Sequence, residues 1–195
     1  MIERENKAAK YKLVKGVVLW LTGLPCSGKS TIAGILERMA RESNLKAEFL
    51  DGDVVRQSLS HDLGFSREDR DAHIKRIGFV CQLLARNGVM VFASFVSPYR
   101  EARDSNRHLI GAFVEIYVSA SVEACERRDV KGLYKKARAG EIQGFTGISD
   151  PYEPPLHPEI ICETEKEAPE ESAAKIWNFL EQKGYLVRRS HKSII

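Results

Sequence analysis

Residues 17–31 of the chain read VVLWLTGLPCSGKST, and this stretch decides the fold. Its first six residues form a continuous apolar run, which is typical of a parallel strand buried on both faces. Apolar residues then recur at helical spacing from Ile32 to Ala40, which predicts a helix. Between the two, residues 23–30 satisfy the pattern G-x-x-x-x-G-K-[S/T]. Strand, glycine-rich turn and helix in this order predict a phosphate-binding loop (P-loop) that binds a nucleoside triphosphate.

The residue types of this loop match the chemistry of phosphate binding. Gly23 and Gly28 permit a close backbone approach that a Cβ atom would block. The amides of residues 25–30 then face the phosphates from a helix start, where the helix dipole favours negative charge. Lys29 supplies a catalytic cation for the β- and γ-phosphates, and the Ser30 hydroxyl is a predicted Mg²⁺ ligand. The predicted nucleotide-binding residues are Gly23, Leu24, Pro25, Cys26, Ser27, Gly28, Lys29, Ser30 and Thr31. The alternative is a glycine turn beside an exposed lysine.

Strand and helix patterns alternate along the rest of the chain. The predicted strands cover 47–53, 89–96, 113–120 and 160–164. The predicted helices cover 66–88, a short segment from Pro98, and about Pro169 to Gly184. This alternation predicts an α/β fold with a five-stranded parallel sheet and right-handed crossovers. The 195 residues show no internal repeat or linker, so one domain over 1–195 is expected.

The composition argues against several classes of protein. The chain is 43% hydrophobic and 29% charged, which is typical of a globular protein. It lacks both the apolar run of a membrane span and the pattern of a secretory signal. A net charge of +3 makes nucleic acid an unexpected partner. The four cysteines lack metal-ligand spacing, so reduced thiols and a cytoplasmic location are expected.

Two short segments follow predicted strands, where an open α/β sheet places its ligands. In LDGDVVR (50–56), Asp51 or Asp53 could accept a hydroxyl proton or help to hold Mg²⁺, and Arg56 could bind an anion. The alternative is an aspartate helix cap beside a solvated arginine. In SPYR (97–100), Ser97 ends a strand, and the alternative is a simple helix start.

A basic segment lies between the fourth and fifth strands. Residues 127–138 hold six basic side chains and one acidic side chain, and glycines follow at 140, 144 and 147. This pattern predicts a lid, over about 127–150, that closes on phosphates and excludes water. A solvated basic helix is the alternative. A nucleic-acid patch is disfavoured because the segment has few aromatic residues for base stacking.

Together these segments resemble the adenylylsulfate kinase family. The resemblance covers nearly the whole chain and rests on LTGLPCSGKST, LDGDVVR, DLGFSREDR, SPYR and especially KGLYKKARAGEIQGFTGISDPYEPP. It implies a P-loop nucleotide-kinase-like three-layer sandwich with a mobile basic lid. It also implies ATP and Mg²⁺ as cofactors, a homodimer, and phosphorylation of the 3′-hydroxyl of adenosine 5′-phosphosulfate (APS).

The resemblance assigns roles by position. Phe65 and Phe145 would enclose the substrate adenine, and Arg56 and Arg70 would face the phosphosulfate. Asp51 lies closest to the role of general base. The substrate-binding residues implied are Asp53, Arg56, Phe65, Arg70, His73, Val96, Ser97, Lys131, Gly144 and Phe145. Ser97 is also implied as a catalytic residue, because the family serine is described as a phosphoserine intermediate. Direct in-line transfer from ATP is physically sufficient without that intermediate.

The chain departs from the family pattern at two places. His73 stands where the family has asparagine, and Ala72 replaces a customary glutamate. Pro25 and Cys26 replace smaller loop residues, and Pro25 gives up one amide donor. Two alternatives therefore stay open: a kinase of another small hydroxylated acceptor, and a nucleotide-binding regulatory protein with reduced catalysis. The presence of Lys29 and Asp51 disfavours the second.

Overall fold

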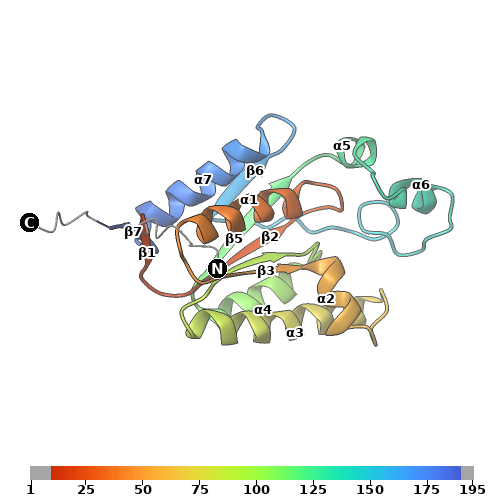
Figure 1. Cartoon of the computed structure of the whole chain (residues 1–195). Helices are drawn as coiled ribbons and strands as arrows, with labels where there is room; N and C mark the ends of the chain where they lie inside the picture. Colours follow the sequence, from red (N-terminus) through yellow and green to blue (C-terminus); the bar gives the residue numbers. More distant parts are fainter. Residues whose placement is uncertain (1–9, 190–195) are drawn as a thin grey trace, which may run out of the picture.

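The five predicted strands form one parallel sheet at the centre of the structure (Figure 1). The computed structural model describes residues 10–189. The sheet order is β3-β4-β2-β5-β6, from strands Ala47–Asp51 (β3), Met90–Ser94 (β4), Val17–Thr22 (β2), Phe113–Ser119 (β5) and Ile160–Glu163 (β6). The strand before the P-loop, β2, is therefore the central strand, and all of its residues are buried.

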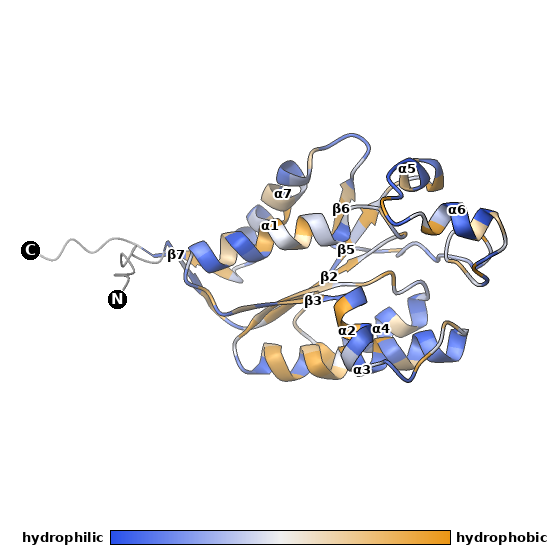
Figure 2. Cartoon of the chain, turned by 45° about the vertical axis from the view of Figure 1, so that its right-hand side comes forward, coloured by the Kyte–Doolittle hydropathy of each residue, from blue (hydrophilic) through white to orange (hydrophobic). Residues whose placement is uncertain are grey.

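Helices cover both faces of this sheet. One face carries α1 (Lys29–Glu42) and α7 (Pro169–Gln182), and the other carries α3 (Arg67–Arg86) and α4 (Arg100–Ile110) (Figure 1). Strand side chains alternate between faces, so β2 contributes Leu19 to one core and Trp20 to the other. In Figure 2 hydrophobic colour follows the strands, whereas the helices show hydrophilic and hydrophobic residues along their length. The predicted three-layer α/β sandwich is confirmed.

Smaller elements complete the structure. Three short helices lie near the carboxyl end of the sheet: α2 (Gly52–Ser58), α5 (Val122–Arg127) and α6 (Leu133–Arg138). At the opposite end, β1 (Tyr11–Leu13) and β7 (Leu186–Arg188) form an antiparallel pair that the sequence analysis does not predict (Figure 1). Within residues 10–189, no helix has the length and apolar character that crossing a membrane requires.

Two predicted boundaries differ from the structure for identifiable reasons. The strand predicted to residue 53 ends at Asp51, whose carboxylate accepts the Asp53 N–H at 3.0 Å and caps α2. The helix predicted from Pro98 begins at Arg100 instead. Its first amide, at Arg100, donates to the Glu153 carboxylate at 2.9 Å. A contact from a distant segment therefore caps this helix, and Pro98 does not begin it.

The close packing of α3 on α4 predicts a strong effect of Gly78→Ala. A Cβ atom at Gly78 would lie 2.0 Å from Asn106 Oδ1. The Asn106 amide is buried and donates to the Ile74 carbonyl at 2.9 Å, so it cannot move without losing this bond. We expect G78A to lower the free energy of unfolding by about 1–3 kcal/mol in urea denaturation.

Gly34→Ala is the matched control, because Gly34 is also a helix-interior glycine and a Cβ there meets no atom within 4 Å. This change should raise the free energy of unfolding by up to about 1 kcal/mol. Equal effects of the two substitutions would contradict the packing argument.

Candidate active site

The P-loop connects β2 to α1 and adopts a strained backbone. Cys26 has a φ of 61° and Gly28 a φ of 106°, both in the left-handed region. A Cβ atom at Gly23 would lie 2.4 Å from the Val118 carbonyl oxygen. The Thr164 hydroxyl donates to the Ser27 carbonyl at 2.9 Å and fixes the far side of the loop. The loop is therefore held in shape by its neighbours, with its amides at the start of α1.

Lys29 folds back into this loop. Its Nζ donates to the carbonyl oxygens of Gly23 at 3.1 Å and Leu24 at 2.7 Å, and the side chain is buried. Burial disfavours the charged form and lowers the pKa of Lys29 to about 8. The ammonium group therefore lies inside the turn where phosphates would bind, on a side chain long enough to exchange these carbonyls for phosphate oxygens.

Three oxygen-bearing side chains meet beside the start of α1. Ser30 Oγ donates to Asp51 Oδ2 at 2.6 Å and lies 3.1 Å from Ser94 Oγ. The other Asp51 oxygen caps α2, so this residue is both a helix cap and part of the site. Hydroxyl and carboxylate oxygens suit a hard cation such as Mg²⁺. The sequence analysis missed Ser94, which lies inside the predicted strand 89–96 and joins the site through its register beside Asp51.

The oxygen atoms of Ser30 and Asp51 also indicate how a metal ion would be held at this site. Within residues 10–189, no group of three His, Cys, Asp or Glu side chains could form a protein-only metal cage. Mg²⁺ in phosphoryl-transfer sites is characteristically held by one or two protein oxygens together with phosphates and water. Ser30 and Asp51 fit that arrangement.

Two arginines of the predicted acceptor site lie close to the ring of Phe65. Arg56 Nη1 donates to the carbonyls of Leu63 at 3.1 Å and Gly64 at 2.7 Å, and its guanidinium stacks 4.3 Å from the Phe65 ring centroid. Burial, and then repulsion from Arg70, lower the pKa of Arg56. Like charges brought this close favour an anion between them. Because Arg56 is bound to the Leu63 and Gly64 carbonyls, it is not the solvated arginine of the alternative interpretation.

Arg70, on α3, binds the lid segment through its side chain. Its guanidinium donates to the Phe65 carbonyl at 2.9 Å, the Gly144 carbonyl at 2.5 Å and the Thr146 hydroxyl at 2.8 Å. It also lies 3.7 Å from the Asp150 carboxylate. The Arg70 side chain therefore joins the backbone of Phe65 to the backbone of Gly144, which precedes Phe145. The two predicted adenine-stacking residues thus belong to segments that meet.

The predicted lid is folded rather than open. Phe145 packs edge-on against Tyr134 with ring centroids 4.9 Å apart, and the Tyr134 hydroxyl donates to the Pro25 carbonyl at 3.0 Å. Lys131 pairs with Asp53 across the site. These contacts tie α6 to the P-loop and to α2. Tyr134 is a second residue that the sequence analysis missed as a site component.

The Ser97 hydroxyl is buried beside two side chains of β2. It accepts a hydrogen bond from Trp20 Nε1 at 3.0 Å and lies 3.0 Å from Thr22 Oγ1, with the side chain only 2% exposed. The preceding carbonyl, Val96, accepts from Thr22 at 2.8 Å. The catalytic role of Ser97 stays a prediction, and in this structure Trp20 and Thr22 contact its hydroxyl. A phosphoserine route would require it to leave both partners.

His73 lies on the buried face of α3. Burial, with repulsion from Arg56 and Arg76, lowers its pKa to about 4, so the imidazole is neutral at pH 7. Its ring meets the Phe95 ring edge-on, with centroids 5.6 Å apart. Nδ1 is buried without a hydrogen-bond partner among residues 10–189. A buried polar atom without a partner is uncommon in folded proteins, so His73 marks an unusual point of this site.

All four cysteine thiols are free, and burial raises the pKa of each one: Cys26, Cys81, Cys125 and Cys162. For Cys26, the Asp129 carboxylate adds to the effect of burial and outweighs Lys29. Each thiol is therefore mostly protonated at neutral pH.

Comparison with known proteins decides the family. The sequence model described as adenylylsulphate kinase matches residues 15–163. The chain belongs to the adenylylsulphate kinase family. Its resemblance to this family at sequence level is therefore confirmed, and the chain is a kinase.

Curated adenylyl-sulfate kinases align with this chain over nearly their whole length. The protein from Rippkaea orientalis is 60% identical over 89% of this chain and 96% of its own length. The protein from Halothermothrix orenii is 55% identical, with 88% and 93% covered. Among solved structures, Mycobacterium tuberculosis APS kinase in complex with AMPPNP and APS has a TM-score of 0.83 at 40% identity, covering 86% of this chain and 98% of that chain. These likenesses also confirm the P-loop kinase fold.

The buried Lys29 of this kinase predicts weaker ATP binding at high pH. Free Lys29 has a pKa of about 8, whereas phosphate contacts would restore its charge. Raising the pH from 7 to 9 should therefore weaken ATP binding roughly tenfold, with proton uptake on binding. Isothermal titration calorimetry in buffers of different ionisation enthalpy measures both quantities.

The exposed lid residue Lys136 provides the control, because Lys136→Ala should leave this pH dependence unchanged. A wild-type ATP affinity that stays constant between pH 7 and 9, without proton uptake, would contradict the assignment to Lys29.

Proposed function

We propose that this kinase transfers the γ-phosphoryl group of ATP to the 3′-hydroxyl of APS, with Mg²⁺ as cofactor. The observation that carries the proposal is the arrangement at the carboxyl end of the sheet. The P-loop and the Ser30–Asp51 pair lie on one side, and the Arg56–Arg70 pair under the lid lies on the other. A triphosphate and a second anionic substrate thus each have a matching half-site.

In this mechanism the protein positions groups and neutralises charge. Lys29 exchanges its loop carbonyls for the β- and γ-phosphates, and the P-loop amides bind the same phosphates. Asp51 receives the proton of the attacking 3′-hydroxyl. Mg²⁺, when bound, neutralises phosphate charge, and Ser30 and Asp51 would hold it, with Asp51 acting through water. Transfer is direct, because the buried Ser97 hydroxyl is committed to Trp20 and Thr22.

The acceptor half-site follows from the same geometry. The two guanidinium groups would bind the phosphosulfate, and Phe65 and Phe145 would stack on the adenine. The remaining contacts are assigned to Asp53, His73, Val96, Ser97, Lys131 and Gly144. Arg70 and Lys131 now hold Gly144 and Asp53, so APS would replace some of these contacts within the protein. Support comes from the relative solved with APS, which is 40% identical.

His73 supports a second candidate, a kinase of another small hydroxylated acceptor. The neutral imidazole has an unpaired buried Nδ1 where the family pattern has an asparagine amide. Since the imidazole donates and accepts through fixed ring positions, it could select a different hydroxyl pattern. The other alternative, a regulatory protein with reduced catalysis, is disfavoured. Lys29 is present and contacts the P-loop at Leu24, and Asp51 is present and contacts Ser30.

Three further properties belong to the proposal. One domain spans residues 1–195, the active form is a homodimer, and the location is the cytoplasm. Four free cysteines support a reducing compartment. A hexameric relative, APS kinase from Thiobacillus denitrificans with a TM-score of 0.69 at 32% identity, is a precedent for assembly within the family. That relative is covered over 30% of its length and this chain over 90%. Light scattering of the purified chain measures the assembly directly.

The decisive assay combines ATP, Mg²⁺ and APS with identification of the product by mass. The wild-type chain should form the 3′-phosphorylated product. Asp51→Asn removes the proposed base and should lower kcat by about 10²–10⁴-fold. The control is Asp62→Asn, which removes a carboxylate that pairs with Arg76 at the surface and should leave kcat unchanged. Product formation by D51N at more than half the wild-type rate would exclude Asp51 as the base.

Phe65→Ala tests the acceptor half-site, because Phe65 is 62% exposed and contributes little to the core. Loss of one stacked ring should raise the Kd for APS by about 10–100-fold and leave the Kd for ATP unchanged. Phe79→Ala removes a similarly exposed ring, at 56%, from α3 and should change neither constant. Equal losses for APS and ATP in F65A would assign the ring to the nucleotide side.

A further inference from the structure

Three parts of the site meet at the hydroxyl of Thr22. Thr22 ends β2, directly before the P-loop, and its side chain is fully buried. We call residues 95–99 the acceptor loop and residues 150–154, which follow the lid, the lid base. Thr22 Oγ1 lies 2.8 Å from the Val96 carbonyl and 3.0 Å from Ser97 Oγ, both in the acceptor loop. It also lies 3.0 Å from the Tyr152 hydroxyl in the lid base.

The hydrogen bonds of 3.0 Å or less among these groups can all form at the same time. Trp20 Nε1 donates to Ser97 Oγ, which leaves the Ser97 proton free to reach Thr22. The carbonyl of Val96 can only accept, so Thr22 donates its one proton there. The two lone pairs of Thr22 then accept from Ser97 and Tyr152. One hydroxyl therefore uses its full capacity to join three segments.

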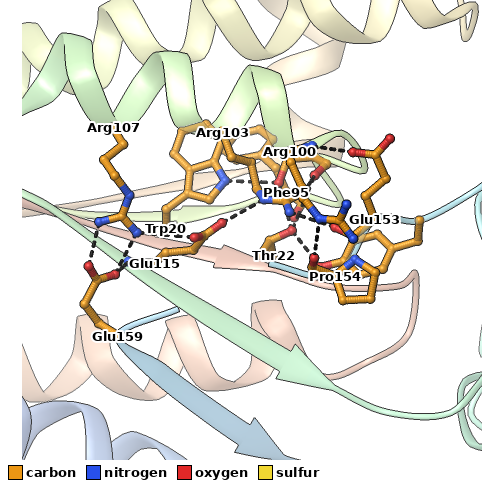
Figure 3. A network of polar contacts seen from close by, with 12 residues as sticks. Trp20, Thr22, Phe95, Arg100, Arg103, Arg107, Glu115, Glu153, Pro154 and Glu159 are labelled. Atoms are coloured by element: carbon orange, nitrogen blue, oxygen red, sulfur yellow. Dashed lines mark hydrogen bonds and ion pairs between the residues drawn. The ribbon is translucent and has the colours of Figure 1, made fainter. Parts of the chain in front are cut away.

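Arg103 of α4 makes a second connection between the acceptor loop and the lid base (Figure 3). Its buried guanidinium donates to the Ser97 carbonyl at 2.6 Å and the Glu153 carbonyl at 2.7 Å. Its Nε donates to the Glu115 carboxylate at 2.7 Å, which fixes the guanidinium. The Glu153 amide in turn donates to the Pro98 carbonyl at 2.9 Å. Two side chains of β2 extend the connection to the P-loop strand: Trp20 reaches the acceptor loop alone, whereas the Thr22 hydroxyl reaches both the acceptor loop and the lid base.

We propose that Thr22 is a positioning residue that fixes the P-loop, the acceptor loop and the lid base relative to one another. The inference rests on the proposed function, since it concerns the alignment of two substrates. Thr22 is buried beneath the site and acts through Val96, Ser97 and Tyr152. In-line transfer is sensitive to displacements of about 1 Å, which can cost about 10²-fold in rate. Loss of this hydroxyl should therefore lower kcat more than substrate affinity.

Thr22→Val keeps the shape of the side chain and removes the hydroxyl. It should lower kcat by about 10–100-fold, with the KM for ATP within about twofold of wild type. Thr22→Ser keeps the hydroxyl and should stay within about threefold of the wild-type kcat. A purely structural role would lower Tm without this split between kcat and KM. Wild-type kcat in T22V, or an equal loss in T22S, would overturn the proposal.

Two tyrosines that stack on each other provide a matched pair. Tyr152→Phe removes the hydroxyl that reaches Thr22 and should lower kcat by about 3–10-fold. Tyr117→Phe removes the neighbouring hydroxyl, for which the structure gives no contact to Thr22, and should have no effect. The double variant T22V/Y152F should be no slower than T22V, because both changes remove the same bond. Additive losses would contradict a shared contact.

Hydrogen exchange supplies a readout that is independent of the acceptor. The amide of Glu153 should exchange at least tenfold faster in T22V than in wild type, and T22S should restore its protection. If wild-type protein forms no product from APS, the proposed function fails, while this exchange measurement still decides the positioning role. Unchanged exchange over residues 150–154 in T22V would overturn the inference.

Discussion

The site depends on one geometric constraint, which is that neighbouring parallel strands end at the same edge of the sheet. The register pairs Asp51 of β3 with Ser94 of β4, and Ser94 with Leu21 of β2. Residues far apart in the sequence therefore meet at Leu21, two residues before the P-loop begins at Gly23. A parallel sheet needs long crossovers to achieve this, and the helices in those crossovers supply Lys29 and Arg70. The phosphate-binding and acceptor-binding groups consequently share one edge.

Much of the fold and part of the site could be predicted from local sequence. The P-loop, the five strands and the lid segment each have a signal within a short window, and Asp51 lies in one of them. Ser94, Tyr134 and Thr22 could not be found in this way, because their roles arise from register and packing. The predicted start of this helix at Pro98 was wrong for the same reason. The helix begins at Arg100 because its cap comes from Glu153, which is distant in the sequence.

The resemblance to a known family supplied residue roles that local patterns could not. It directed attention to Phe65 and Arg70, and the structure brings their segments to the lid. It also carried over Ser97 as a catalytic residue, although the hydroxyl faces Trp20 and Thr22 in this chain. Position in an alignment identifies which residue lies at a site. The hydrogen bonds of that residue decide which of its atoms can act.

The protonated state of all four thiols has a practical consequence for studying lid movement. Few thiolates exist on the chain at neutral pH, so thiol-directed reagents meet little competing reactivity. Val130 lies in the lid between α5 and α6 and is 96% exposed. A cysteine introduced there by Val130→Cys would be the most accessible thiol among residues 10–189. The natural chain is thus already a suitable background for a single spectroscopic label that follows the lid in solution.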